Sequence, residues 1–238
     1  MKIVAIIPAR GGSKRIHQKN IRLFAGKPII AYSIAAAKKT GLFDRIIVST
    51  DSEEIACIAR KENAEIPFMR PADISDEYTV TGEVIFHALK WLEESGDPVD
   101  YVCCIYATAP FIKPEYIVHG YNEMKKMAAA SAFSVTTFPY TIFRALKINE
   151  KGRLEMIWPE NHSKRSQDLP DAYHDAGQFY WADARKFVKG KKFLTRDTLP
   201  IVIPRYLVQD IDTNEDWETA ERMFIALQRR TEQKSDPC

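Results

Sequence analysis

The chain has 238 residues, 45% of them hydrophobic, which is ample for one large core, and we expect a single domain over residues 1–238. The first 43 residues carry nine Lys or Arg and no Asp or Glu, and the remainder has 25 basic against 32 acidic residues, which argues against a nucleic-acid surface over the whole body. The four cysteines form no CxxC pair and we find no secretory segment, which argues against a disulfide framework and favours a cytoplasmic protein. No apolar run approaches the roughly 20 residues of a membrane helix, so we expect no membrane partner.

Apolar runs typical of strands alternate with amphipathic helical patterns over the first 136 residues. In chain order, the pattern predicts a strand at 3–7, a helix at 29–40, a strand at 45–49, a helix at 53–61, a strand at 65–68, a helix at 81–95, a strand at 101–106, a helix at 114–127 and a strand at 132–136. This alternation indicates the α/β class, with a mostly parallel sheet flanked by helices on both faces.

Residues 137–170 interrupt the alternation with short β-like pieces and polar turns. We expect this segment to leave the main sheet and to be a dimerisation segment, because such excursions often mediate dimer contacts. Beyond it, strands are predicted at 177–182, 201–203 and 206–209, and a closing helix at 214–228. Thr213 and Asp216 have the spacing of a capping box at the start of that helix.

Five of the N-terminal cations cluster in residues 10–22, called here the basic loop, which reads Arg10-Gly11-Gly12-Ser13-Lys14-Arg15-Ile16-His17-Gln18-Lys19-Asn20-Ile21-Arg22. The loop follows the predicted strand 3–7, and open α/β sheets bind ligands at the carboxyl ends of their strands. Its glycines can turn backbone N–H groups into one concavity while Arg10, Lys14 and Lys19 converge on the same place. The loop therefore predicts a phosphate site; the alternative is a solvated basic surface loop.

The two common phosphate-loop patterns do not fit this segment. Gly26-Lys27-Pro28 lacks the Ser or Thr of a Walker A loop, and Ile21 stands where that loop needs its first glycine. Gly11-Gly12 is an adjacent pair with no third glycine in the register of a dinucleotide-binding turn. The spacing thus supports neither a P-loop ATPase nor hydride transfer.

A second candidate group is Asp210 and Asp212, at the end of the predicted strand 206–209. Residues i and i+2 of a strand share a face, so the two carboxylates can be presented to one point. Mg²⁺ takes one or two carboxylates together with substrate phosphate oxygens. The two Asp residues could therefore bind Mg²⁺ opposite the basic loop if a nucleoside triphosphate lies between the loop and the metal. The alternative is that Asp212 only assists the following helix and Asp210 is solvated.

Together these residues resemble a known family. The motifs are Ile7-Pro8-Ala9-Arg10-Gly11-Gly12-Ser13-Lys14-Arg15, Lys19-Asn20-Ile21, Gly26-Lys27-Pro28, Ser49-Thr50-Asp51, Arg70-Pro71 and Asp210-Ile211-Asp212-Thr213. They are similar to those of the cytidylyltransferases that activate nonulosonic acids as CMP-sugars, and the similarity runs over nearly the whole chain. It implies a Rossmann-like nucleotidyltransferase fold, CTP as substrate, Mg²⁺ as cofactor and a homodimer.

The resemblance also implies roles for individual residues. Nucleotide binding falls to Ala9, Arg10, Gly11, Gly12, Ser13, Lys19, Asn20 and Arg70, with Asn20 and Arg70 at the nucleoside end. Catalysis falls to Arg10, Lys19, Asp210 and Asp212, the last two as metal ligands. The expected chemistry is attack of the sugar's anomeric hydroxyl on the α-phosphate of CTP, with pyrophosphate as the leaving group and no protein nucleophile.

The chain departs from the sialic-acid members of the family in two places. Where they have Leu-Gln-Pro-Thr-Ser-Pro, this chain has Ile105-Tyr106-Ala107-Thr108-Ala109-Pro110, so that a sugar-contacting Gln becomes Tyr106. Where they have Asn-Gly-Ala, it has His174-Asp175-Ala176-Gly177-Gln178-Phe179-Tyr180-Trp181, shortly after Gln167-Asp168-Leu169-Pro170. Both runs are similar to those of pseudaminic acid cytidylyltransferases.

This second resemblance implies pseudaminic acid as the acceptor, since exchanging an amide for a phenol changes both shape and hydrogen bonding. The sugar-binding candidates are Tyr106, Thr108, Gln167, His174, Asp175 and Gln178, whereas Phe179 and Trp181 are better explained as core. His17 has no assigned role. The alternatives are activation of sialic or legionaminic acid, and a non-catalytic nucleotide-binding protein of the same fold.

Overall fold

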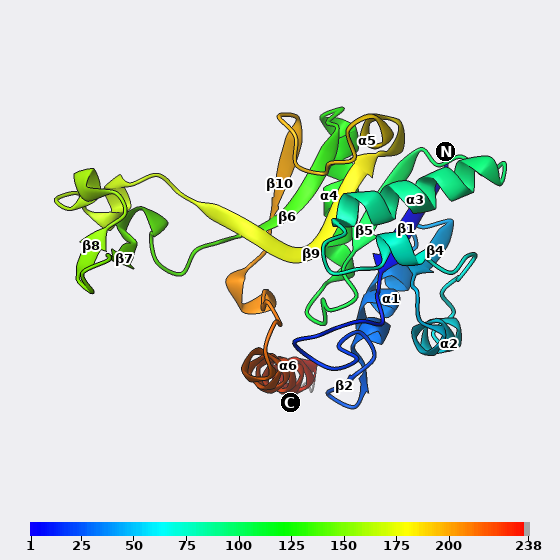
Figure 1. Ribbon diagram of the computed structural model, residues 1–238, viewed down its shortest axis with the longest axis horizontal. Helices are drawn as coiled ribbons and strands as arrows, with labels where there is room; N and C mark the ends of the chain where they lie inside the picture. Colours follow the sequence, from blue (N-terminus) through cyan, green and yellow to red (C-terminus); the bar gives the residue numbers. More distant parts are fainter. Residues whose placement is uncertain (236–238) are drawn as a thin grey trace.

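A six-stranded sheet forms the centre of the molecule in the computed structural model, which describes residues 1–235 (Figure 1). Its strand order is β10-β6-β9-β5-β1-β4. The strands are β1 (Ile3–Pro8), β4 (Arg45–Ser49), β5 (Tyr101–Ile105), β6 (Ser131–Thr137), β9 (Tyr173–Asp183) and β10 (Thr198–Val202). β1 pairs in parallel with β4 and β5, and β10 with β6, while β9 lies antiparallel between β5 and β6. The sheet is thus mostly parallel, as the alternating pattern predicts.

Helices cover both faces of this sheet. They are α1 (Ile29–Thr40), α2 (Glu53–Lys61), α3 (Thr81–Glu94), α4 (Pro114–Lys126), α5 (Ala184–Gly190) and α6 (Asn214–Ser235). The larger apolar cluster joins α1, α2, α4 and α6 to one face, and the smaller one joins α3 and α5 to the other. Phe179 and Trp181 of β9 are fully buried in the larger cluster, which confirms their interpretation as core. None of the helices in the part of the chain described is long and apolar enough to cross a membrane.

Two predicted strands are absent, and a proline explains the first of these absences. Residues 65–68 contribute one bridge, Glu65 to Ile47, and Pro67 has no N–H with which to continue the ladder. Residues 206–209 follow Pro204 and fold into a short 3₁₀ helix, Arg205–Leu207, before an irregular segment. The prediction that Asp210 and Asp212 share the face of a strand is therefore wrong.

Two short strands and one α-helix were also not predicted. The short strands β2 (Leu23–Phe24) and β3 (Lys27–Pro28) form a hairpin after the basic loop, and α5 follows β9. The remaining short elements are the 3₁₀ helices Ala72–Ile74, Ile142–Arg144, Pro159–Asn161 and Ser166–Asp168. Cys57, Cys103 and Cys104 are free thiols, and Cys238 lies outside the described residues. The cytoplasmic location inferred from the cysteines stays a prediction.

The segment between β6 and β9 extends well away from the sheet (Figure 1). It carries the two-stranded hairpin of β7 (Leu146–Ile148) and β8 (Leu154–Met156). An excursion is therefore present where the sequence predicts one, and its role in dimerisation stays a prediction.

Candidate active site

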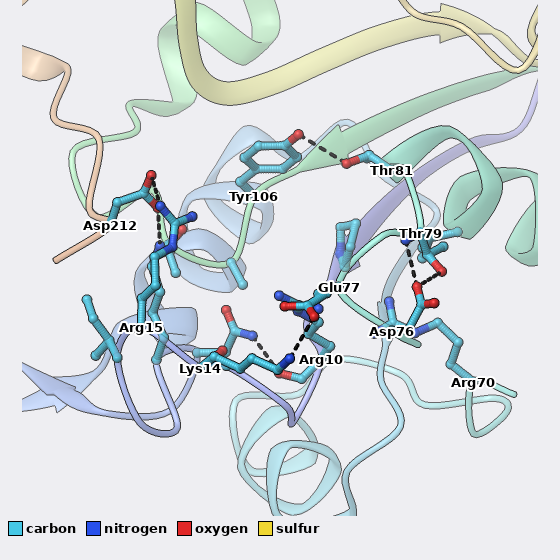
Figure 2. A pocket seen from close by; sticks show the side chains of 18 of the residues that line it. Arg10, Lys14, Arg15, Arg70, Asp76, Glu77, Thr79, Thr81, Tyr106 and Asp212 are labelled. Atoms are coloured by element: carbon cyan, nitrogen blue, oxygen red, sulfur yellow. Dashed lines mark hydrogen bonds and ion pairs between the residues drawn. The ribbon is translucent and has the colours of Figure 1, made fainter. Parts of the chain in front are cut away.

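A cavity of about 510 Å³ opens at the carboxyl ends of β1 and β5 (Figure 2). The basic loop, the segment from Arg70 to Thr81, the residues that follow β5 and the irregular segment before α6 form its walls. The lining residues are Pro8, Arg10, Ser13, Lys14, Arg15, Ile16, Lys19, Asn20, Arg70, Ile74, Asp76, Glu77, Thr79, Thr81, Val84, Tyr106, Ala107, Thr108 and Asp212. This is the edge of the sheet at which the sequence predicts a ligand.

Internal hydrogen bonds give the basic loop its shape. The Asn20 side-chain amide donates to the Arg10 carbonyl oxygen at 2.9 Å, which ties the two ends of the loop together. Ile16 is buried beneath it. The Gly11 N–H donates to Asp51 at 2.8 Å, and the Ser13 N–H donates to the Gly11 carbonyl at 2.9 Å. These two amides are bonded within the protein, contrary to the prediction that the glycine run turns its N–H groups into one concavity.

Asp212 faces the basic loop across the cavity. Its carboxylate pairs with Arg15 Nη1 at 2.7 Å and with Lys19 Nζ at 3.4 Å, as Figure 2 shows for Arg15. Asp216, three residues after Thr213, accepts bonds from the backbone N–H groups of Thr213 (2.8 Å) and Asp212 (3.1 Å), so the predicted capping box is present and also fixes the Asp212 backbone. A cationic loop and an acidic residue therefore share one hollow, as the sequence predicts.

Asp210 does not join this arrangement. It is exposed and lies outside the residues that line the cavity. Its charge acts on Asp175 instead: burial raises the pKa of the Asp175 carboxyl, and the nearby Asp210 charge adds a smaller rise. Within residues 1–235 no group of three or more His, Cys, Asp or Glu could hold a metal ion by itself. Of the predicted pair of metal ligands, only Asp212 lines the cavity, and the metal-binding role of both residues stays a prediction. One carboxylate in a cationic cavity still fits Mg²⁺, because this ion commonly takes one or two carboxylates and completes its shell with phosphate oxygens and water.

Arg70 provides a second cationic wall. Its side chain is almost completely buried, donates from Nε to Ser75 Oγ at 3.1 Å and lies 3.7 Å from Asp51. Burial lowers the pKa of Arg70; the charge of Arg10 lowers it further, and Asp51 opposes the shift. The Arg10 and Arg70 charges therefore act on the same part of the cavity.

Two acidic residues in this cavity escaped the sequence analysis. Glu77 pairs with Lys14 at 2.6 Å, and the hydrogen bond from Lys14 lowers the Glu77 pKa. Asp76 accepts bonds from the Thr79 hydroxyl and N–H, which lower its pKa. The signal that could have revealed them is the Asp-x-x-Thr pattern of an Asx-type turn directly before a helix. The basic loop consequently faces carboxylates on two sides.

Two of the six sugar-binding candidates line the cavity. Tyr106 and Thr108 follow β5, and the Tyr106 hydroxyl lies 3.1 Å from Thr81 Oγ1. Burial raises the pKa of Tyr106, so this phenol stays protonated and can donate a hydrogen bond. The position at which the chain departs from the sialic-acid pattern is therefore a wall of the cavity.

The other four candidates lie elsewhere. Gln178 is buried, donates its side-chain amide to the Leu207 carbonyl and does not line the cavity, so its role as a sugar contact stays a prediction. His174 bonds to the Asp175 carbonyl at 2.9 Å, and Asp175 accepts the Tyr180 hydroxyl at 2.9 Å. Gln167 is exposed on the excursion. Among the nucleotide-binding candidates, Ala9 is buried and Gly11 and Gly12 do not line the cavity. His17 is exposed and also lies outside it.

A family model described as cytidylyltransferase matches residues 4–199. The chain belongs to this family. A pseudaminic acid cytidylyltransferase of Campylobacter jejuni is 40% identical to it over 94% of this chain and 97% of the relative. A CMP-N,N'-diacetyllegionaminic acid synthase of Legionella pneumophila is 34% identical over 94% and 97%. These relatives confirm the resemblance that the motifs indicate.

The fold of this cytidylyltransferase also occurs in solved structures. A CMP:2-keto-3-deoxy-manno-octonic acid synthetase complexed with CTP aligns with a TM-score of 0.71 at 13% identity, covering 95% of this chain and 99% of the other. A 4-diphosphocytidyl-2C-methyl-D-erythritol synthase from Anaerococcus prevotii aligns with a TM-score of 0.64 at 18% identity, covering 93% and 97%. The fold expected from the resemblance is thus confirmed.

Proposed function

We propose that this cytidylyltransferase transfers CMP from CTP to the anomeric hydroxyl of pseudaminic acid, with release of pyrophosphate. The observation that carries the proposal is a cavity of about 510 Å³ in which Arg10, Lys14 and Lys19 surround a space bounded by Asp212 on the opposite side. Such a space suits a triphosphate, whose charge needs several cations. The similarity to the Campylobacter enzyme over nearly the whole of both chains supports the choice of acceptor.

In the proposed mechanism, the protein acts mainly by positioning and by charge. Arg10, Ser13 and Lys19 hold the phosphates, so that positive charge is already in place as pyrophosphate leaves. Asn20 and Arg70 hold the nucleoside end. Asp212 would hold Mg²⁺, which, when bound, neutralises charge on the phosphate oxygens and helps to orient them.

We place the acceptor beside Thr108 and Tyr106, and Tyr106 is a position at which the chain departs from the sialic-acid pattern. A partly buried, protonated phenol donates a hydrogen bond but lacks the amide geometry of Gln. A site built to bond one arrangement of sugar hydroxyls rejects an isomer that leaves those groups unpaired. Tyr106 is therefore the residue to which we assign the choice among nonulosonic acids.

The experiment is an acceptor panel with pyrophosphate release as the readout. Saturating CTP and Mg²⁺ are combined with pseudaminic, legionaminic or sialic acid, and kcat/KM is measured for each. Pseudaminic acid is expected to be the preferred acceptor by about 10-fold or more. If it is the poorest of the three, the acceptor assignment is wrong. If CTP binds in calorimetry but no sugar releases pyrophosphate, the chain is a nucleotide-binding protein without turnover.

A homodimer is the second part of the proposal, with residues 137–170 at the contact. In the β7–β8 hairpin, the apolar side chains share one face, because Leu146 pairs with Met156 and Ile148 with Leu154. On the opposite face of the hairpin, Lys147 and Glu155 form an ion pair. Ile148 and Leu154 are 72% and 69% exposed. An isolated two-stranded hairpin with an uncovered apolar face has marginal stability, which a second chain would improve. Light scattering is expected to give the mass of two 27.2 kDa chains, and a monomer at working concentrations would contradict this part.

A further inference from the structure

Helix α6 contacts the chain directly after the basic loop through one of its faces. Asn214, Trp217 and Glu221 have the i, i+3, i+7 spacing of residues that line up along a helix. Asn214 Oδ1 accepts a bond from Arg22 Nη1 at 2.7 Å, and the Arg22 guanidinium lies 4.7 Å from the centre of the Trp217 ring. Figure 1 shows α6 next to the β2 hairpin. The last residue of the basic loop is thus fixed to α6.

Glu221 holds the hairpin turn that follows. Its carboxylate accepts the Ala25 N–H at 2.6 Å. Ala25 has φ 45° and is followed by Gly26 at φ 86°; the left-handed region costs a residue with a side chain roughly 1 kcal/mol, so other contacts must hold the turn. The Tyr32 hydroxyl donates to the Phe24 carbonyl at 2.7 Å, and the buried Phe24 ring packs edge-on against Trp217. Glu221 is therefore the hydrogen-bond partner of a residue held in the left-handed region.

The same helix also fixes the opposite wall of the cavity. Asp212 lies two residues before α6 begins, and Asp216 in its first turn accepts the Asp212 N–H. One rigid helix is therefore bonded to the Asp212 backbone at its start and to the hairpin turn two turns later. The distance between Asp212 and the cations Arg15 and Lys19 depends on both attachments.

We propose that Glu221 is a positioning residue that, through the Ala25 turn, holds the basic loop at the spacing from Asp212 that a triphosphate requires. Glu221 and Trp217 do not line the cavity, so they act through the loop and not on the nucleotide. This inference rests on the proposed use of CTP. It adds a group of residues on α6 to those that determine nucleotide affinity.

The test compares Glu221→Ala with Glu221→Gln. The amide oxygen of Gln can still accept the Ala25 N–H, whereas Ala leaves that amide without its partner. We expect Glu221→Ala to raise the KM for CTP by about 10-fold, because small displacements of binding groups have effects of this size or larger, and to leave the KM for the sugar within about 2-fold. Glu221→Gln is expected to restore most of the CTP affinity. The matched control is Glu218→Ala, since Glu218 lies on the same helix and pairs with Arg222 at 3.2 Å.

Several outcomes would overturn the inference. An unchanged KM for CTP in Glu221→Ala is one, and an equal rise in both KM values that Gln does not reverse is another, because a general disturbance of the active site affects both substrates. If Glu221→Ala does not fold, Arg22→Met removes the bond to Asn214 instead and is expected to weaken CTP selectively. Calorimetric CTP binding separates this inference from the proposed function: absence of turnover in every variant, with the ranking of CTP affinities intact, contradicts only the latter.

Discussion

Replacing Asp212 with asparagine is expected to lower kcat for pyrophosphate release by about 100-fold or more, the scale at which loss of one positioned charged group affects turnover. The Asp212 carboxylate faces the basic loop and lies 2.7 Å from Arg15 and 3.4 Å from Lys19. Asparagine keeps the shape but has no charge with which to hold Mg²⁺. Without the carboxylate the two cations are also freed to bind phosphate, so CTP affinity is expected to stay constant or rise while kcat falls.

The matched control for this substitution is Glu215→Gln, an exposed acid in the first turn of α6, for which wild-type kcat is expected. Asp210→Asn tests whether Asp210 is a metal ligand, as the family resemblance implies, or stays outside the site, as in this structure. With Asp210 outside the cavity, its loss is expected to reduce kcat less than the loss of Asp212. Equal losses would mean that Asp210 moves into the site when substrates bind. Full activity of Asp212→Asn in Mg²⁺ would remove Asp212 from the mechanism.

The helices could be predicted closely from the sequence because local signals determine them. The bounds of α1 and α2 match the prediction at both ends. Gly41 adopts φ 64° just after α1, and the Ser52 hydroxyl accepts the Ile55 N–H at the start of α2. The two false strands had suitable apolar runs, but Pro67 removes a backbone donor from the first, and no strand among the described residues pairs with 206–209. Strand pairing is a property of distant chain segments, and hydrophobic spacing does not encode it.

The candidate site could be predicted in part, and the division has a physical reason. The basic loop is continuous in sequence, so its cations arrive at the cavity together. Asp210 and Gln178 depend instead on the path of the backbone around them. A 3₁₀ helix in place of a strand removes the shared face that would have aligned Asp210 with Asp212, and a backbone carbonyl at Leu207 captures the Gln178 amide. Asp76 carries a local turn pattern, but the position of Glu77 opposite Lys14 became recognisable only once the fold had brought residues 70–81 to the basic loop.

Lys19→Met is expected to lower kcat/KM for CTP by about 100-fold, on the scale of removing one positioned donor from a site of developing charge. The Lys19 side chain is only 19% exposed and faces the cavity, so methionine can fill its volume and fold is expected to be retained. Lys61→Met on the exposed surface of α2 is the control, with wild-type kinetics expected. A Lys19→Met enzyme with normal kcat/KM would show that Lys19 only balances the charge of Asp212.

The double variant Lys19→Met with Asp212→Asn asks whether the two residues act on the same step. If both residues hold one triphosphate and its metal in place, either substitution alone disrupts this arrangement and the second has little further effect. The combined loss in kcat/KM is therefore expected to remain within about 10-fold of the larger single loss. Fully multiplicative losses would mean that the two side chains act independently. Partial recovery of CTP binding in the double variant, relative to Lys19→Met alone, is also expected, because the Asp212 carboxylate, which has lost one of its two cationic partners and repels phosphate, is then gone.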